Sequence, residues 1–319
     1  MKILIISLLL IYQISTNPIN KDRIVFPDDS DERIYSRFQK ESNDPVKDED
    51  DSDDQDDFSF LLNNTNILRS ENDTEEVLLE VQKGGKSKYG KHFQGDIALM
   101  PDQVKLLNSM DFSDRTGLKS AIYRWPKDID GKVNVPYICS DEYSPDQKTL
   151  ILSAMADIEK YTCIKFLPHQ DQKDYIHILS EDGCSSHLGM TGGRQVISLE
   201  IDDCVSRATI LHELIHSLGF DHIQSRSDRD EFVDILWENV EKDEFSQFDK
   251  VNPKRFKNFG TPYDYYSVMH YDSKAFTKNG KRTILPKDQK YRKIIGRLPY
   301  MSEGDANRIN KMYKCDFDE

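Results

Sequence analysis

The sequence predicts a domain of the α+β class, in which short strands and helices follow one another behind an acidic N-terminal part. Three observations indicate this class. The composition becomes that of a globular domain from Ser120 onward. Four short apolar or alternating runs in that region have the length and character of strands. Three segments open with a helix-capping serine, at Ser144, Ser206 and Ser302.

Each predicted element follows from a local signal. The run Ser144-Pro145-Asp146-Gln147 is a capping box with proline at the first helical position, so a helix should extend from there to about Tyr161. Further helices are predicted after Ser206, over Phe232–Val240 and after Ser302. The inward residues of the first helix would be Ile151, Ala154, Met155 and Ile158, and those of the last helix Ala306, Ile309 and Met312 or Tyr313. The predicted strands are Lys132–Ile138, Cys163–Leu167, Tyr175–Leu179 and Gln195–Leu199.

The N-terminal part divides into a leader and an acidic segment. Residues 1–16 combine a lysine at position 2 with the apolar run Ile3–Tyr12, the pattern of a secretory signal peptide; a buried N-terminal helix is the alternative. No later stretch approaches eighteen apolar residues, so we expect a secreted, extracellular protein that spans no membrane. Residues 17–115 carry most of the net charge of −14, and Asp44–Asp57 contains nine acidic residues, so this segment should lack a core as far as about Ser87.

Five cysteines lie beyond the acidic segment, and the secretory signal makes disulfides the expectation. Two bridges would leave one thiol over, and the sequence alone leaves the pairing open. Two sequons, at Asn63 and Asn72, are candidate glycosylation sites within the acidic segment. The part from Thr116 onward has no basic pattern typical of nucleic-acid binding, so no nucleic-acid partner is expected.

The stretch LHELIHSLGFDH, residues 211–222, has the spacing of a metal site. On a helix, His212 and His216 leave the same face, and Gly219 permits a turn that returns His222 as a third ligand. Three imidazoles and an open position describe a catalytic zinc site, with Glu213 placed to hold a water. The five-residue pattern HExxH alone can arise by chance. Two histidines on one face of a helix are more often packed in the core or exposed at the surface than bound to a metal. The longer pattern fixes five positions and favours the zinc site.

A second motif, Ser267-Val268-Met269-His270-Tyr271, follows the zinc motif, and together they resemble the astacin family of metzincin peptidases. The resemblance covers about Thr116–Cys315 and also rests on RWPKDIDGKVNVPY, TGGRQVISL and the cysteine spacing. It implies a two-lobed domain, with a twisted mixed sheet and two long helices in the N-terminal lobe. The C-terminal lobe would be mostly irregular and end in a helix. Met269 would form an apolar floor beneath the histidines, and Tyr271 would bind zinc at rest and the oxyanion during catalysis.

The resemblance also implies pairings and a latent form. It pairs Cys163 with Cys315 and Cys184 with Cys204, and it makes the strand around Gln195–Leu199 an edge that binds extended substrate. The run Phe93-Gln94-Gly95-Asp96 resembles the family's propeptide motif, in which Asp96 occupies the water position on zinc. A trypsin-like protease would remove residues 17–115 by cutting Arg115–Thr116, with Lys119 a second candidate, leaving 116–319 as the active domain.

Three departures from the family pattern stand out. The family typically has a glutamate directly after the third histidine, where it anchors the new N-terminus, whereas this chain has Ile223. The N-terminus is then held differently, or is not anchored. Cys139 has no partner in the common four-cysteine pattern. The chain ends four residues after Cys315, so the resemblance implies a catalytic domain without the binding modules found in many relatives.

The sequence therefore predicts a secreted zinc endopeptidase, monomeric and made as a latent precursor, in which Glu213 is the general base. An inactive homologue that binds zinc or proteins is the alternative, favoured only by Ile223. The acidic segment is interpreted as solvated and removable. The alternative is that it binds calcium or a basic partner. Lys274–Arg297 contains nine basic residues. They form a solvated basic face, which we favour, or they make the enzyme prefer an acidic residue after the scissile bond.

Overall fold

The computed structural model describes residues 86–87, 90–108, 121–251, 253 and 256–315. The predicted signal peptide, the two sequons at Asn63 and Asn72, and the predicted cleavage site at Arg115–Thr116 lie outside the described residues. Within those ranges, none of the helices combines the length and apolarity needed to cross a membrane.

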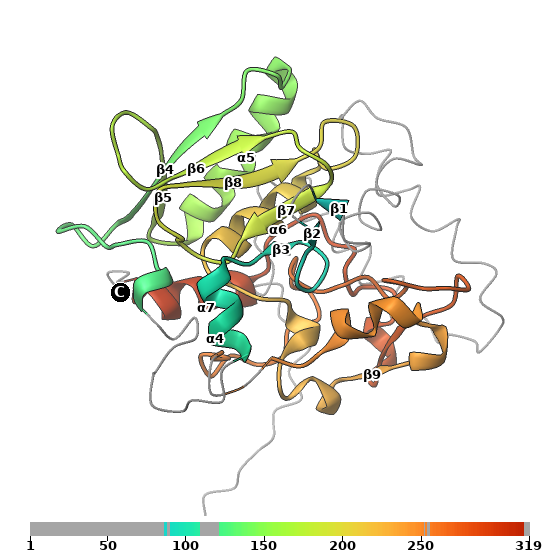
Figure 1. The fold of residues 1–319 in the computed structure, drawn as a ribbon. Helices are drawn as coiled ribbons and strands as arrows, with labels where there is room; N and C mark the ends of the chain where they lie inside the picture. Colours follow the sequence, from blue (N-terminus) through green and yellow to red (C-terminus); the bar gives the residue numbers. More distant parts are fainter. Residues whose placement is uncertain (1–85, 88–89, 109–120, 252, 254–255, 316–319) are drawn as a thin grey trace, which may run out of the picture.

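A twisted mixed sheet forms the upper part of the molecule (Figure 1). Its six strands have the order β3-β7-β8-β6-β4-β5, and only the β7–β8 pair is antiparallel. The four predicted strands are confirmed to within one residue at each end. The strands are β3 (Ile97–Ala98), β4 (Val133–Cys139), β5 (Ile164–Pro168), β6 (Tyr175–Leu179), β7 (Cys184–His187) and β8 (Arg194–Leu199).

The prediction that the strand around Gln195–Leu199 lies at the edge of the sheet is wrong. β8, around Gln195–Leu199, lies inside the sheet, because it pairs with β6 on one side and with β7 on the other. The neighbour that lies further out is β7, whose sequence Cys-Ser-Ser-His gives no apolar signal. The outer side of β7 pairs in parallel with β3, so a strand from the N-terminal segment occupies this end of the sheet.

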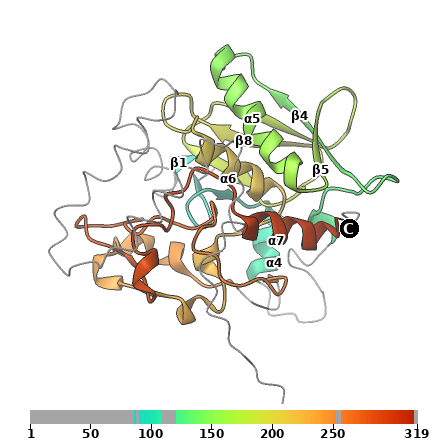
Figure 2. The same ribbon diagram turned by 180° about the vertical axis from the view of Figure 1, so that it is seen from behind.

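Two long helices cover one face of the sheet, which Figure 2 shows from behind. α5 (Pro145–Tyr161) begins at the predicted capping box, where Ser144 accepts from the main chain of Gln147 and Gln147 bonds back to Ser144. Its buried residues are the predicted face of Ile151, Ala154, Met155 and Ile158. α6 (Arg207–Ser217) is capped by Ser206, packs against α5, β7 and β8, and is buried from Ala208 to Ser217.

The lower part of the molecule has little regular structure (Figure 1, orange and red). The predicted helix over Phe232–Val240 is wrong: Val233–Ile235 forms β9, and Trp237–Asn239 forms a single 3₁₀ turn, η5. Val233 and Ile235 are β-branched, and β9 pairs with β10 (Ile284–Pro286). This pairing with a strand distant in sequence outweighs the local periodicity that favoured a helix. The other short turns are η3 (Ile223–Ser225), η4 (Arg229–Glu231), η6 (Lys242–Phe248) and η7 (Gln289–Tyr291).

The last helix, α7 (Glu303–Tyr313), begins at the predicted Ser302 and buries Ala306, Ile309, Met312 and Tyr313. It ends beside a disulfide between Cys315 and Cys163, and a second disulfide joins Cys184 to Cys204. Both pairs are those that the resemblance implies. Cys139 is half-buried and unpaired.

The described N-terminal segment lies between the sheet and the lower part (Figure 1, cyan). It contains β1 (Lys86–Ser87), β2 (Gly90–Lys91), β3 and α4 (Pro101–Asn108), and η2 (Ala121–Tyr123) follows it. Gln103 donates from Nε2 to the carbonyl of Leu188, next to β7, at 2.9 Å. Gln94 donates from Nε2 to the carbonyl of Asp249, in the lower part, at 3.4 Å. The segment therefore contacts both parts of the domain.

Candidate metal centre

α6 positions the first two histidines of the site. His212 and His216 lie one turn apart on the helix, and their Nε2 atoms are 3.0 Å from each other. The Nδ1–H of His212 donates to the carbonyl of Val268 at 2.8 Å, and that of His216 to the carbonyl of Phe220 at 2.7 Å. These bonds place the proton on Nδ1 and leave Nε2 free to bind a metal.

Gly219 brings the third histidine to the same point. Its φ of +101° is a backbone conformation that suits glycine, and its N–H donates to the carbonyl of His216 at 2.8 Å. The chain reverses there and places Nε2 of His222 3.1 Å from Nε2 of His212. The sequence spacing predicted this return.

Asp96 lies at the centre of the three imidazoles. Its Oδ2 is 3.1 Å from Nε2 of His212 and 3.3 Å from Nε2 of His222, and its Oδ1 is 3.4 Å from Nε2 of His216. Asp96 is at the end of a tight turn in which Gln94 and Gly95 have positive φ.

The donor set fits zinc. Three imidazole nitrogens and one carboxylate oxygen are zinc ligands, and all four ligand atoms lie within 4.8 Å of one another. Ligands 2.0–2.1 Å from a tetrahedral ion would be roughly 3.3 Å apart. The observed nitrogen–nitrogen distances of 3.0 and 3.1 Å are close to this spacing. Small outward movements would therefore accommodate the ion.

Burial controls the charges in this centre. It lowers the pKa of His222 to about 3 and also lowers that of His216, which favours the neutral imidazoles that metal binding requires. Burial opposes ionisation of Asp96, but the surrounding imidazoles hold the pKa of its carboxyl well below the usual value. Burial, and then the charge of Asp96, raise the pKa of Glu213 well above its usual range.

Glu213 follows the first histidine and is fully buried. Neither of its carboxylate oxygens has a hydrogen-bond partner among the described residues. A buried polar group without a partner is costly and usually has a functional reason. A carboxylate beside a metal site is suited to accept a proton from a water molecule.

The predicted floor of the site is also buried. Met269 is inaccessible, and its carbonyl accepts from the main chain of Ile223 at 3.0 Å. Asp305 of α7 holds the turn before Met269, accepting from Ser267 Oγ at 2.5 Å and from the N–H of Val268 at 3.0 Å. The sequence analysis missed this role, because the predicted helix start at Ser302 explained an acidic residue at this position.

Tyr271 contacts the N-terminal segment as well as the histidines. Its ring lies 4.5 Å, between centroids, from that of His222. Its hydroxyl donates to the carbonyl of Gln94. Zinc binding by Tyr271 at rest stays a prediction.

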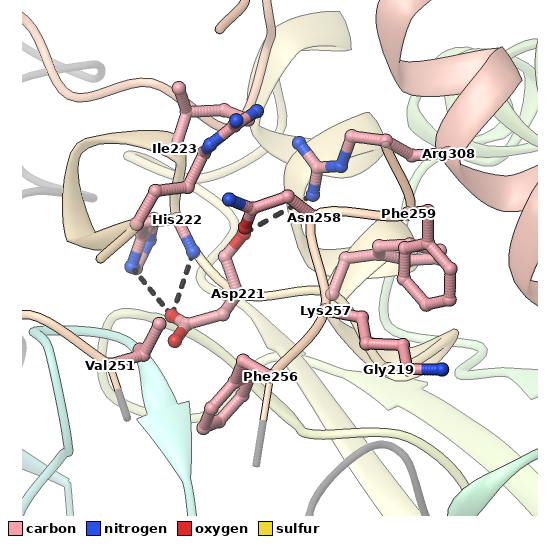
Figure 3. Close-up of a pocket in the computed structure, with 12 residues that line it drawn as sticks. Gly219, Asp221, His222, Ile223, Val251, Phe256, Lys257, Asn258, Phe259 and Arg308 are labelled. Carbon is pink, nitrogen blue, oxygen red and sulfur yellow. Dashed lines mark hydrogen bonds and ion pairs between the residues drawn. The ribbon is translucent and has the colours of Figure 1, made fainter. Parts of the chain in front are cut away.

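The environment of His222 contains two further polar residues that the sequence analysis missed. Gln94 accepts from Nδ1–H of His222 at 3.1 Å and from Ser225 Oγ at 2.9 Å. Asp221 also lies beside the ring and accepts from the main chain of His222 at 2.7 Å (Figure 3). Ile223, in the position of the family glutamate, is 1% exposed and belongs to the apolar core. The signal for Asp221 was available, because an acidic residue directly precedes the third histidine.

Comparison with known proteins places this geometry in a family. The family model described as Astacin, a peptidase family, matches residues 118–314. "Zinc metalloproteinase nas-8" of Steinernema carpocapsae is 36% identical over 261 residues, which are 82% of this chain and 60% of that protein. "Low choriolytic enzyme" of Oryzias latipes is 45% identical over 192 residues, 60% of this chain and 69% of that protein. The chain thus spans about two thirds of the length of these relatives.

A solved structure agrees in fold. The structure of "High choriolytic enzyme 1", described as a hatching enzyme zinc-protease from Oryzias latipes, superposes with a TM-score of 0.59 and 39% identity. The match covers 62% of this chain and 97% of that chain. Together with the α+β fold and the three-histidine centre, these similarities show that the chain belongs to the astacin family of peptidases.

Proposed function

We propose that this chain is a secreted zinc endopeptidase, made as a latent precursor that hydrolyses peptide bonds in extracellular proteins once its N-terminal segment is removed. The observation that carries the proposal is the buried cluster of His212, His216, His222 and Asp96. The cluster combines the ligands of a catalytic zinc site with a carboxylate from outside the matched domain. The names of the relatives, zinc metalloproteinase and choriolytic enzyme, support the same activity.

The residues around the cluster would divide the chemistry between them. Zinc held by the three imidazoles would lower the pKa of a bound water to about 7 and polarise the scissile carbonyl. Glu213 would accept the proton of the attacking water and deliver it to the leaving amine. Tyr271, whose hydroxyl already donates to a carbonyl oxygen, would donate to the oxyanion. Met269 would close the floor of the site to solvent.

The segment around Asp96 would keep the precursor inactive in three ways. Asp96 occupies the point where the three Nε2 atoms converge. Gln94 binds the hydroxyl of Tyr271 through its carbonyl. β3 covers the outer side of β7, where an extended peptide would add as a further strand. Cleavage of Arg115–Thr116 by a trypsin-like protease would release all three contacts.

The decisive test uses the full chain and trypsin. The wild-type precursor should contain one zinc ion, and after trypsin treatment it should degrade casein in a chelator-sensitive way. Glu213→Ala should retain zinc and lose casein degradation. Activity of the purified, cleaved Glu213→Ala protein would show that Glu213 is not the base. A wild-type protein that binds zinc but never cleaves would instead favour the inactive homologue, for which Ile223 is the motivating departure.

A further inference from the structure

The three histidines differ in the acceptor that binds their Nδ1–H, the ring N–H on the side away from the metal site. His212 and His216 donate from Nδ1 to main-chain carbonyls of the domain itself. His222 donates instead to the side-chain oxygen of Gln94, at 3.1 Å. Gln94 belongs to the segment whose removal the proposed function requires. Activation would therefore take the acceptor away from one ligand of the three.

The ring of His222 would need another acceptor. Its side chain is completely buried, so water from the surface does not reach its N–H in this form. A buried donor without an acceptor is costly, and histidines that bind metals almost always donate their other ring N–H to a carboxylate, a carbonyl or a water. After cleavage the replacement is either a residue that remains or a water that enters where Gln94 lay.

Asp221 is placed to supply it. Its Oδ1 lies 3.7 Å from Nδ1 of His222, about 0.7 Å beyond an ordinary N–H···O bond. Its Oδ2 is buried without a hydrogen-bond partner among the described residues. Figure 3 shows the carboxylate next to the imidazole, with both dashed lines to His222 ending on one oxygen and none on the other. A small side-chain movement would complete the bond.

Ser225 is a competing acceptor. Its hydroxyl donates to the same Gln94 oxygen at 2.9 Å and would also lose its acceptor on activation. A hydroxyl is a weaker acceptor than a carboxylate, and charge-assisted bonds are roughly twice as strong as neutral ones. The geometry therefore favours Asp221 and makes Ser225 the matched control.

We propose that Asp221 is a positioning residue, which takes over the Nδ1–H of His222 from Gln94 when the N-terminal segment leaves. This inference rests on the proposed zinc site and its removable segment. The same imidazole would be oriented by an amide in the precursor and by a carboxylate in the cleaved enzyme. A carboxylate partner raises the basicity of a histidine ligand, so zinc retention in the cleaved form should depend on Asp221.

The test measures how fast zinc passes to a chelator, before and after trypsin cleavage of the same full-length preparation. Asp221→Ala also removes the bond to the main chain of His222, but this loss affects both forms and cancels in their comparison. We expect release to be about 10- to 100-fold faster than wild type in the cleaved form and less than about threefold faster in the precursor. Asp221→Asn keeps an acceptor oxygen and should restore most of the retention.

Two controls isolate the exchange. Ser225→Ala should release zinc at nearly the wild-type rate in both forms. Gln94→Ala should match wild type after cleavage, because the residue has then been removed. If Asp221→Ala does not fold, Asp221→Ser is small, polar and too short to reach the ring, and should show the same loss confined to the cleaved form.

Equal acceleration of both forms by Asp221→Ala would overturn the exchange and leave Asp221 a structural residue. A loss confined to the cleaved form in Ser225→Ala would assign the role to Ser225 instead. In both cases the wild-type protein would still bind one zinc ion and cleave peptides, so the proposed function would stand. A wild-type precursor without stoichiometric zinc would contradict the proposed function itself.

Discussion

Replacement of Asp96 by asparagine tests whether one buried charge keeps the precursor inactive. The substitution preserves the shape of the side chain and removes its charge. Asp96 is completely buried and contacts three imidazoles at 3.1–3.4 Å. In the zinc-bound precursor the charge of Asp96 would pair with that of the ion, and removal of one member of a buried charge pair costs about 2–5 kcal/mol. Because each 1.36 kcal/mol is tenfold, the fraction of molecules with the segment displaced should rise by roughly 30- to 5,000-fold.

Other contacts of the segment should keep this activation partial. β3 would still pair with β7, and Gln103 would still donate to the carbonyl of Leu188. The uncut Asp96→Asn protein should therefore cleave a fluorogenic peptide faster than the uncut wild type and more slowly than the trypsin-treated enzyme. After trypsin treatment the two proteins should be equal.

The uncut samples need a precursor that cannot activate itself, so in those samples each variant should also carry Arg115→Gln and Lys119→Gln. The samples for trypsin treatment keep Arg115 and Lys119. Asp102→Asn makes the same change at an exposed position of α4 and should leave the precursor inactive. Asp96→Ala excludes weak binding by the asparagine oxygen. If uncut Asp96→Asn and Asp96→Ala are both as silent as wild type, and are fully active once cut, latency does not depend on Asp96.

Three further predictions concern catalysis and stability. Tyr271→Phe should lower kcat by about 10²- to 10³-fold with zinc content unchanged, and an unaltered kcat in steady-state assays would exclude an oxyanion role. Burial lowers the pKa of His270 from its ordinary value of 6.5 to about 4. The folded state is therefore stabilised above pH 6.5, and up to about 3 kcal/mol of this stability should be lost as the pH falls toward 4. Urea unfolding of the zinc-free protein at pH 7 and pH 4.5 measures this loss, which should be smaller in His270→Gln and would be the same in both proteins if another group were responsible. Replacing Cys163 and Cys315 together by serine opens a link across 152 residues and should cost about 2–5 kcal/mol, seen as a lower Tm; an unchanged Tm would show that α7 docks without it.

The sequence predicted elements with strong local signals and failed where distant contacts decide. The capping boxes at Ser144 and Ser302 begin helices as expected, because the bonds that define them span only three residues. β7 was missed, because Cys-Ser-Ser-His has no apolar alternation and becomes a strand only beside β8 and β3. Val233–Ile235 was assigned to a helix, although its partner in β10 lies about 50 residues away.

The candidate site shows the same division. The spacing within residues 211–222 predicted that three histidines converge, since the helix repeat and one glycine determine their positions. The bonds that orient the rings could not be read in the same way. His212 and His216 use main-chain carbonyls, which carry no residue signature, and His222 uses Gln94, more than a hundred residues earlier in the chain.

The C-terminal helix has a consequence for the order in which the site can be completed during synthesis. The three histidines of the candidate site are synthesised about 80 residues before Asp305 and about 90 residues before Cys315. Asp305 holds the turn before Met269, and Cys315 ties the end of α7 to Cys163 at the start of β5. While the nascent chain is still growing, the histidines are present but the turn beneath them lacks these supports. Final assembly of the metal site therefore awaits the synthesis of α7.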